Sequence, residues 1–155
     1  MQKITPYLWF EGNGEEALDY YANIFKDAKI SKDGYYSDGM HLPKGTLLTA
    51  TLEIFGQKFV ILNAGPHHKF NDSISFSIAC DDQEEVDYYW HALSKEGQEV
   101  QCGWLKDKYG VSWQIIPKRF MDLMKAATPN QAQKIMGAIM GMKKIIIADI
   151  EKAFS

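Results

Sequence analysis

The sequence contains one pattern of elements twice, and this internal repeat limits the possible folds more than any other feature. Residues 4–10 have the composition of a strand, and residues 15–25 place apolar side chains at helical spacing. Farther along, residues 73–78 alternate strictly between polar and apolar side chains, as a half-buried strand does, and residues 83–93 again show helical spacing. A strand followed by a helix is therefore predicted twice.

The two copies also share their register and a closing hairpin. One constant offset superimposes Asp19-Tyr20-Tyr21 on Asp87-Tyr88-Tyr89 without a gap. Residues 55–63 and 109–117 both begin with an aromatic residue and a glycine and continue as a strand. The glycine supplies the positive φ that a tight hairpin turn needs. Between helix and hairpin, further strands are predicted at about 30–37 and 46–55, and shorter ones within about 98–106.

These patterns predict an α+β fold of two tandem βαβββ units followed by a helical tail. The first unit is expected at about residues 1–63 and the second at about 73–117. Residues 64–72 are the predicted joint, because Gly65-Pro66 interrupts regular structure. A chain of 155 residues is expected to form a single domain over residues 1–155.

Residues 118–155 are predicted to be the helical tail. Thr128 and Pro129 resemble the cap and first position of a helix, and Gln131 follows three residues after the cap. A last short helix is expected to end near Phe154. Apolar residues at helical spacing predict one buried stripe, in the core or at a subunit interface because methionine packs adaptably; they are Ile135, Met136, Ile139, Met140 and Met142.

Charge and composition argue against several kinds of partner. The net charge of -3 provides no basic field for nucleic acid. No apolar run approaches the roughly 20 residues that span a bilayer, and residues 1–10 do not resemble a secretion signal. We therefore expect a cytoplasmic protein with no nucleic-acid and no membrane partner. Cys80 and Cys102 are expected to be reduced, buried thiols, with a catalytic cysteine as the alternative.

The tandem units resemble a known superfamily. A βαβββ pair closing around a cup is similar to the vicinal oxygen chelate fold of glyoxalase I, bleomycin-resistance proteins and extradiol dioxygenases. The run of residues 102–117 resembles the signature of the PhnB-like branch, also labelled the 3-demethylubiquinone-9 3-methyltransferase domain family. Residues 4–10, residues 70–75 and the methionine-rich tail resemble that branch too. The resemblance implies a glyoxalase-like open barrel, and family members of this fold commonly form a homodimer.

The resemblance also implies four metal-ligand positions, on the first and last strand of each unit. Metal-binding members of the superfamily carry His, Glu or Gln there. The resemblance puts the last of them at Gln114, and the repeat makes Val60 its partner. Strand alternation and the repeat add Ser75 and Tyr7, or Pro6 instead of Tyr7 if the first strand is shifted by one residue. Zn, Fe and Mn sites are not built from Val, Pro or neutral Ser, so only Gln114 is a suitable ligand. We expect no metal and no other cofactor.

The histidines show no metal-site spacing, since they fall in a predicted loop, the joint and a helix. They are His41, His67, His68 and His91. We expect His67 and His68 to be a solvated loop pair, with adventitious metal binding as the alternative.

Without a metal, the side chains expected to line the cup, the four ligand positions included, are mostly apolar or aromatic. The predicted ligand-binding residues are Tyr7, Trp9, Val60, Leu62, Ser75, Ser77, Trp104 and Gln114, with Ile116 beside them. Such a lining suits a flat or apolar small organic ligand oriented by one or two hydrogen bonds. Trp9 has the alternative of filling the barrel, and alternation turns Trp113 toward the helix.

Three classes of function follow from these residues. The first is metal-independent binding of a small organic ligand, as in the bleomycin-resistance branch. The second is an enzyme, nominally the methyltransferase of the family label, although Gly12-Asn13-Gly14 lacks the third glycine of the usual nucleotide-binding turn. The third is assembly of a homodimer through the tail. No catalytic residue is assigned, because nothing in the spacing distinguishes Glu53 or Asp107 from an ordinary surface carboxylate.

Overall fold

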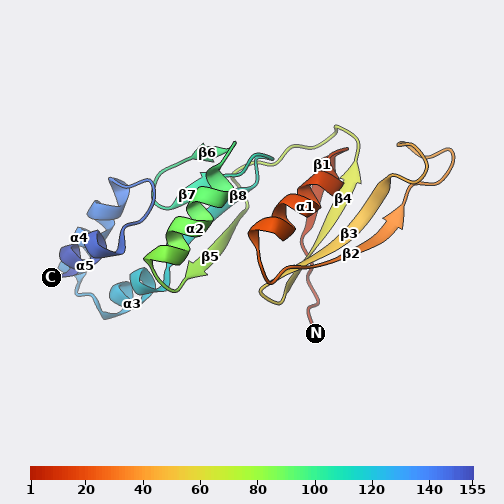
Figure 1. Cartoon of the computed structure of the whole chain (residues 1–155). Helices are drawn as coiled ribbons and strands as arrows, with labels where there is room; N and C mark the ends of the chain where they lie inside the picture. The colour runs from red at the N-terminus through yellow and green to blue at the C-terminus, as the bar shows by residue number, and fades with distance from the viewer. The chain divides into compact units, whose positions relative to one another are not determined.

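Two four-stranded sheets, each with a helix against one face, form the framework of the protein. The computed structural model describes residues 1–155 and separates into unit 1, Met1–Lys69, and unit 2, Phe70–Ser155 (Figure 1). Unit 2 also carries three further helices after its last strand. None of the helices is long and apolar enough to cross a membrane.

Unit 1 is a complete βαβββ unit. Its sheet has the strand order β1-β4-β3-β2, with β1 parallel to β4 and the other neighbours antiparallel. The first strand begins at Tyr7, later than predicted, although the Pro6 carbonyl still accepts a hydrogen bond from the Val60 N–H at 2.9 Å. The elements are β1 (Tyr7–Glu11), α1 (Gly14–Ile24), β2 (Lys29–Tyr35), β3 (Leu47–Ile54) and β4 (Gln57–Ala64).

Unit 2 repeats this topology, with strand order β5-β8-β7-β6 and β5 parallel to β8. The predicted α+β fold with a tandem βαβββ repeat is thereby confirmed. The elements are β5 (Ser75–Cys80), α2 (Gln83–Ser94), β6 (Gln98–Glu99), β7 (Trp104–Lys106), β8 (Ser112–Pro117), α3 (Lys118–Ala126), α4 (Pro129–Met140) and α5 (Ile147–Phe154).

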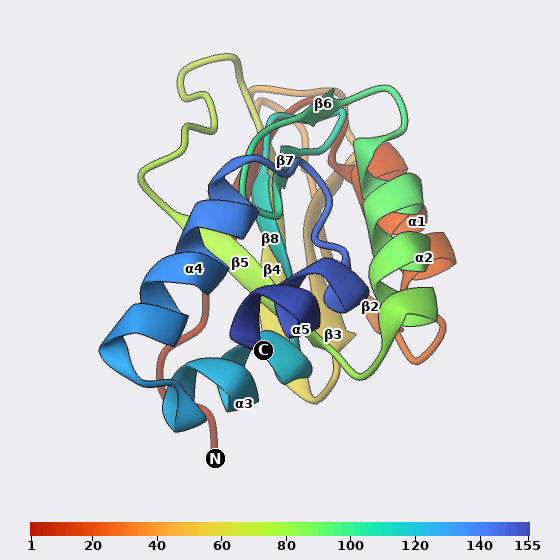
Figure 2. The ribbon, with the colours of Figure 1, turned by 90° about the vertical axis from the view of Figure 1, so that its left-hand side faces the viewer.

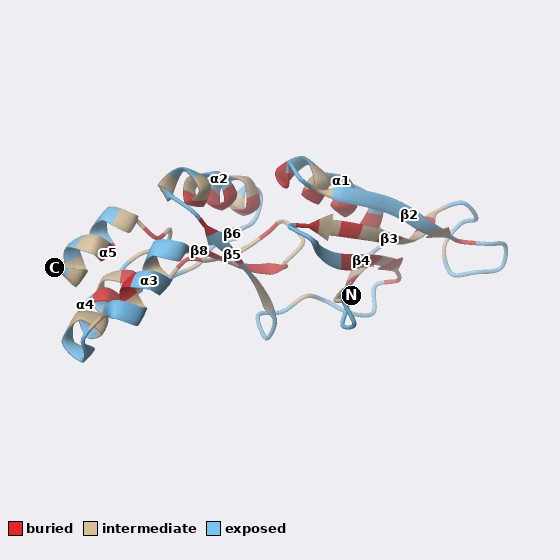
Figure 3. Cartoon of the chain, turned by 90° about the horizontal axis from the view of Figure 1, so that it is seen from below, coloured by how far each residue is buried: buried red, intermediate tan, exposed pale blue.

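Each sheet buries one face against its own helix. Figure 3 shows the buried positions of α1 and α2 on the sides that face the strands. In unit 1, Leu18 and Tyr21 of α1 are buried together with Leu8 and Phe10 of β1. In unit 2, α2 buries its apolar stripe in the same way, and the partner residue Trp113 is only 4% exposed. The alternation prediction that Trp113 turns toward the helix therefore agrees with its burial.

The turn before α1 is a tight packing point. Gly14 donates its backbone N–H to the Asn63 side chain at 2.9 Å, and the Asn63 amide donates to the Leu47 carbonyl oxygen at 2.9 Å. A Cβ on Gly14 would lie 2.7 Å from Asn63 Cβ, which is closer than side chains approach. Packing thus explains the glycine at position 14. Gly12 is explained by its backbone conformation, because its φ of +85° favours glycine.

The tail forms a small core of its own on the end of unit 2. Figure 2 shows α3, α4 and α5 gathered together. Cys102 and Ile116 of the sheet region pack against this core, and the backbone N–H groups of Cys102 and Gly103 donate to the carbonyls of Met142 and Lys143. Its buried members are Leu123, Ile135, Ile139, Ile145 and Ile150.

The predicted apolar stripe of the tail divides in two within the chain, and a subunit interface, the alternative given for the methionines, stays a prediction. Met136 and Met140 are 40% and 67% exposed, while Ile135 and Ile139 are buried. The two pairs lie one residue apart on α4, so they form neighbouring stripes on the helix surface rather than one. Only the isoleucine stripe faces the small core.

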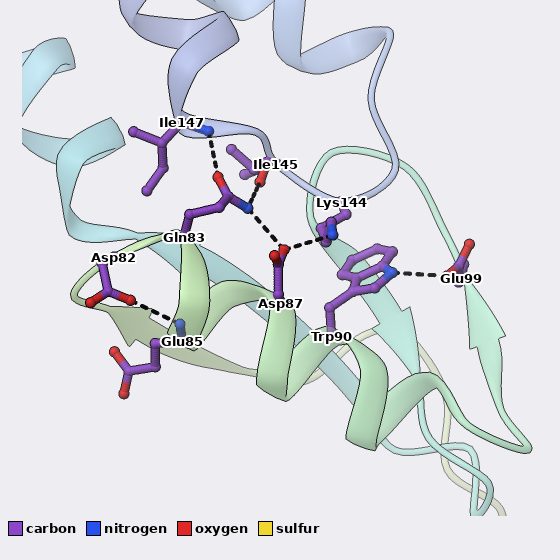
Figure 4. A network of polar contacts seen from close by, with 9 residues as sticks. All are labelled: Asp82, Gln83, Glu85, Asp87, Trp90, Glu99, Lys144, Ile145 and Ile147. Carbon is purple, nitrogen blue, oxygen red and sulfur yellow. Dashed lines mark hydrogen bonds and ion pairs between the residues drawn. The ribbon is translucent and has the colours of Figure 1, made fainter.

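A polar network fixes the tail to α2 (Figure 4). The Gln83 side chain accepts a hydrogen bond from the Ile147 N–H at 2.8 Å and donates to the Ile145 carbonyl at 3.2 Å. Gln83 also donates to Asp87 at 3.0 Å, and Asp87 pairs with Lys144 at 2.6 Å. Hydrogen bonds from Lys144 and Gln83 lower the pKa of the Asp87 carboxyl below its usual value. The tail is therefore held by polar contacts as well as by apolar packing.

Candidate functional site

The face of each sheet that carries no α1 or α2 is the candidate site. In unit 1 this face presents two cross-strand rows, because the register aligns Tyr7 with Val60 and Thr51, and Trp9 with Leu62 and Thr49. Tyr7 is 63% exposed, and Trp9, Val60 and Leu62 are half-buried. The four residues predicted for this unit thus lie together on one mostly apolar surface.

Trp9 is fixed by the segment that follows β4. Its indole N–H donates to the Gly65 carbonyl oxygen at 2.8 Å, and its ring lies nearly perpendicular to that of His68, with centroids 4.7 Å apart. The only polar group of the indole is therefore already paired. What Trp9 offers to a ligand is the apolar ring.

In unit 2 the corresponding face is more polar. The register places Ser77, Gln114 and Trp104 side by side on β5, β8 and β7. Gln114 donates its amide N–H to the Ser75 hydroxyl at 2.9 Å. The four residues predicted for this unit are thus also near neighbours, and two of them bind each other directly.

Ile116 of this face is partly covered by the tail. It was expected beside the predicted ligand-binding residues, but it packs against the apolar core of the tail. Strand alternation places Ile116 on the same face as Gln114, two residues along β8, and the tail covers the sheet at that point. The tail therefore covers part of Ile116, and its place in a ligand site stays a prediction.

The two units differ by two residues in the register of their parallel strands. The closing hairpins align Val60 with Gln114, and the strand-helix pairs align Tyr7 with Ser75. In the sheets, however, Val60 pairs with Tyr7, whereas Gln114 pairs with Ser77. A shift by two keeps every side chain on its predicted face. It changes lateral neighbours only, and Gln114 reaches Ser75 diagonally.

The carboxylates considered as general bases are held by structural contacts. Asp107 is 3% exposed and accepts hydrogen bonds from the Tyr109 and Val111 N–H groups and from the Trp113 indole. Glu53 pairs with Lys29 at 3.4 Å. These contacts give both carboxylates a structural role, so neither needs a catalytic role to account for its position.

Asp33 is a carboxylate at the site that sequence reasoning did not select. It lies at an irregularity of the β2–β3 pairing and accepts hydrogen bonds from the hydroxyls of Ser31, at 2.6 Å, and Thr51, at 2.7 Å. These two bonds lower the pKa of the Asp33 carboxyl. Nothing in the local sequence signals this arrangement, because the irregularity depends on the pairing of two strands.

The thiols are not paired with each other. Cys80 is buried, and Cys102 is half-buried against the tail. Burial raises the pKa of the Cys80 thiol to about 12, so that this thiol stays protonated at neutral pH. Since the thiolate is the nucleophile, Cys80 is unsuited to catalysis.

Two histidines that are distant in the sequence meet at one end of unit 1. His41, in the β2–β3 loop, and His67, after β4, have ring centroids 5.8 Å apart. His68 lies against Trp9, and His91 is on α2 in unit 2. Within each unit, no three or more His, Cys, Asp or Glu side chains are grouped so as to hold a metal ion. Spacing along the chain gave no sign of the His41–His67 pair, because tertiary structure creates it.

Most of the sequence matches a known protein family. Residues 2–116 match the family described as 3-demethylubiquinone-9 3-methyltransferase. The chain belongs to this family. A PhnB protein of this family from Bacillus cereus is 34% identical, with a TM-score of 0.67 over 75% of this chain and 99% of that one. Protein YjdN from Escherichia coli (strain K12) is 27% identical over 139 residues, 72% of this chain and 92% of its own.

The likeness extends to the wider superfamily at the level of the fold. The fosfomycin resistance protein FosX from Listeria monocytogenes has a TM-score of 0.50 over 75% of this chain and 91% of its own, at 16% identity. At 16% identity this likeness concerns the fold alone, whereas the family rests on residues 2–116 and on the PhnB protein. The family match ends at Ile116, so the resemblance drawn for the tail lies outside it.

Proposed function

We propose that this PhnB-like protein binds a small apolar or aromatic molecule without a metal, against the open face of its unit 1 sheet. The observation that carries the proposal is the exposed Tyr7 beside Val60 and Trp9, a surface with aromatic and aliphatic side chains that is bordered by the polar Thr51 and Asp33. Contiguous exposed apolar surface on a folded protein commonly marks an interaction site. An aromatic ligand stacked on these rings would gain affinity beyond simple area burial.

The side chains at the four superfamily ligand positions support metal independence. Tyr7 and Val60 offer no suitable donor set for a divalent metal, and Ser75 is a neutral hydroxyl. The one remaining candidate, Gln114, directs its amide to Ser75 at 2.9 Å. A polar group of the ligand would meet this amide and hydroxyl pair rather than a cation.

Ligand screening with matched variants tests the proposal. Chelator-treated protein is titrated with aromatic and quinone-like compounds by calorimetry. Trp9→Ala and Tyr7→Ala should each weaken a bound compound by about tenfold, the scale of one lost aromatic contact. Tyr88→Ala, at an exposed aromatic residue of α2, is the control and should bind normally. Equal affinities in all three variants, or binding that requires added metal, would contradict the proposal.

The family description supports a second candidate, an enzyme that transfers a methyl group. Such an enzyme needs a methyl donor, for which S-adenosylmethionine is the probe. The backbone N–H of Gly14, at the glycine-containing turn before α1, is occupied by Asn63, which disfavours phosphate-type recognition there. Micromolar binding of S-adenosylmethionine by calorimetry would favour this candidate, and its absence at millimolar concentration would reject it.

We further propose that the protein is a cytoplasmic homodimer, with α4 contributing to the interface. Met136 and Met140 support this, because they are exposed large apolar side chains on one stripe of that helix. Met140→Lys should shift the protein toward monomer in light scattering, whereas Lys134→Glu, an exposed position on another side of the same helix, should not. A monomeric wild-type protein would reject the homodimer.

A further inference from the structure

We propose that His41 and His67 form a binding site for one imidazole-preferring divalent cation, of which Zn²⁺ is the representative. The two rings come from the β2–β3 loop and from the segment after β4, and their centroids are 5.8 Å apart at an interplanar angle of 45°. This site is separate from the four strand positions of the superfamily. It does not depend on the proposed ligand function.

Both imidazoles direct a nitrogen at the same point in space. A Cβ built on Gly65 would lie 2.5 Å from His41 Nε2 and 3.0 Å from His67 Nε2. The separation of the two nitrogens is therefore no more than the sum of these distances, 5.5 Å. Zinc binds imidazole nitrogen at about 2.0–2.1 Å, so two ligands of one ion lie roughly 3–4 Å apart. The range of separations that these distances allow therefore includes the spacing that one ion requires.

Gly65 leaves the space that the two rings occupy. Its backbone is buried, yet it has no side chain to separate the rings. Any other residue at this position would push His41 and His67 apart. The glycine that was predicted to interrupt regular structure thus also allows the two nitrogens to converge.

The segments that carry the histidines are anchored to the sheet. The Gly65 carbonyl accepts hydrogen bonds from the Trp9 indole at 2.8 Å and from the His67 N–H at 2.9 Å. The base of the β2–β3 loop is held by Tyr36, whose hydroxyl donates to the Asn63 carbonyl at 2.7 Å. Anchored ligands lose less conformational freedom on binding a cation, which favours affinity.

The donor set determines the kind of cation and the kind of site. Neutral imidazole suits Zn²⁺, Ni²⁺ and Cu²⁺ rather than Mg²⁺ or Ca²⁺. Since no third His, Cys, Asp or Glu joins the pair, water must complete the coordination. Structural zinc sites use four protein ligands, whereas open positions are typical of sites that exchange ligands. The pair therefore predicts a readily exchangeable cation.

Calorimetric titration of tag-free, chelator-treated protein with Zn²⁺ tests the site. We expect one equivalent to bind, and His41→Ala and His67→Ala each to weaken binding by about tenfold or more, equivalent to losing one ligand. The control is His91→Ala, at an exposed histidine of α2, which should bind as the wild type does. All three positions are exposed, so the substitutions should leave the fold intact.

Nuclear magnetic resonance provides a second readout, because it identifies the histidines themselves. On addition of Zn²⁺, the imidazole signals of His41 and His67 should shift together, and that of His91 should not. Binding that is unchanged in both His41→Ala and His67→Ala, or that shifts the His91 signal instead, would overturn the proposal. Neither result bears on ligand binding by the sheet face, which is measured without metal.

Discussion

Unit 1 and unit 2 share one topology but treat the open faces of their sheets differently. In unit 1, β2 and β3 are seven and eight residues long, and the open face joins aromatic and aliphatic side chains of β1 and β4 to polar ones of β3 and β2, such as Thr51 and Ser31. In unit 2, β6 and β7 have two and three residues, and the tail covers the end of the sheet at Ile116. A repeat can thus preserve its strand order while its surfaces take on separate tasks.

At the positions that correspond in β1, β4, β5 and β8, unit 2 is more polar than unit 1, although Trp104 of β7 is aromatic. Ser75, Ser77 and Gln114 take the places at which unit 1 carries aromatic and aliphatic side chains. In both units the sheet face next to the helix is apolar, because it packs against that helix. The opposite face is free to change, because substitution there costs little buried area.

The largest expected effect comes from the core of the tail. Ile145→Ala should lower the free energy of unfolding by about 2–5 kcal/mol, because Ile145 is 1% exposed and its loss leaves a cavity. Lys134→Ala, at an exposed position of α4 away from the methionines, should change it by less than about 0.5 kcal/mol. Urea unfolding measures both. Equal effects of the two substitutions would mean that the tail is not part of the folded core of unit 2.

Gly14 tests the packing of unit 1 in the same way. Gly14→Ala should destabilise the protein by about 1–3 kcal/mol, because the new Cβ would lie 2.7 Å from Asn63 Cβ. Gly137→Ala, at an open position of α4 with no atom within 4 Å, should stabilise it by about 0.5–1 kcal/mol. Thermal unfolding of both variants gives the comparison. A neutral Gly14→Ala would refute the close approach.

Gln83 tests the polar attachment of the tail, which unit 1 lacks. Gln83→Ala removes the hydrogen bonds to Ile145 and Ile147, and a loss of about 1–2 kcal/mol is expected. Hydrogen exchange of the Ile147 amide should accelerate, whereas Gln133→Ala on the exposed side of α4 should leave it unchanged. Unaltered exchange in Gln83→Ala would show that apolar packing alone holds the segment.

The smallest expected effect is the pH dependence of the same attachment. The pKa of Asp87 is lowered in the folded protein, so its contribution is present above the unfolded pKa and is lost as pH falls through the folded pKa. The wild type should therefore be slightly more stable than Asp87→Asn at neutral pH, and the difference should vanish in acid. Urea midpoints across that range measure it. A difference that grows in acid would contradict the assignment.

Local patterns predicted most of the fold, because strand alternation and helical spacing reflect burial against a neighbouring layer. The same patterns could not separate two adjacent stripes of one helix, so they did not show that Ile135 is buried in the chain while Met136 and Met140 are exposed. They also could not show that Ile116 is covered, since the covering residues lie in the tail. Local patterns could not predict the contact between His41 and His67, because the two residues are distant in the sequence and meet only in the folded chain.

The pairing of residues 102–103 with residues 142–143 also bears on the order in which the protein is assembled during synthesis. Every contact described for unit 1 lies within Met1–Lys69, so its sheet is complete once those residues have left the ribosome. Domains generally fold as they emerge, with the N-terminal part first. Unit 2 must wait, because Ile145 and Ile150 emerge well after the strand carrying Ile116. During that interval the end of its sheet at Ile116 is not yet covered by the tail and remains exposed to solvent.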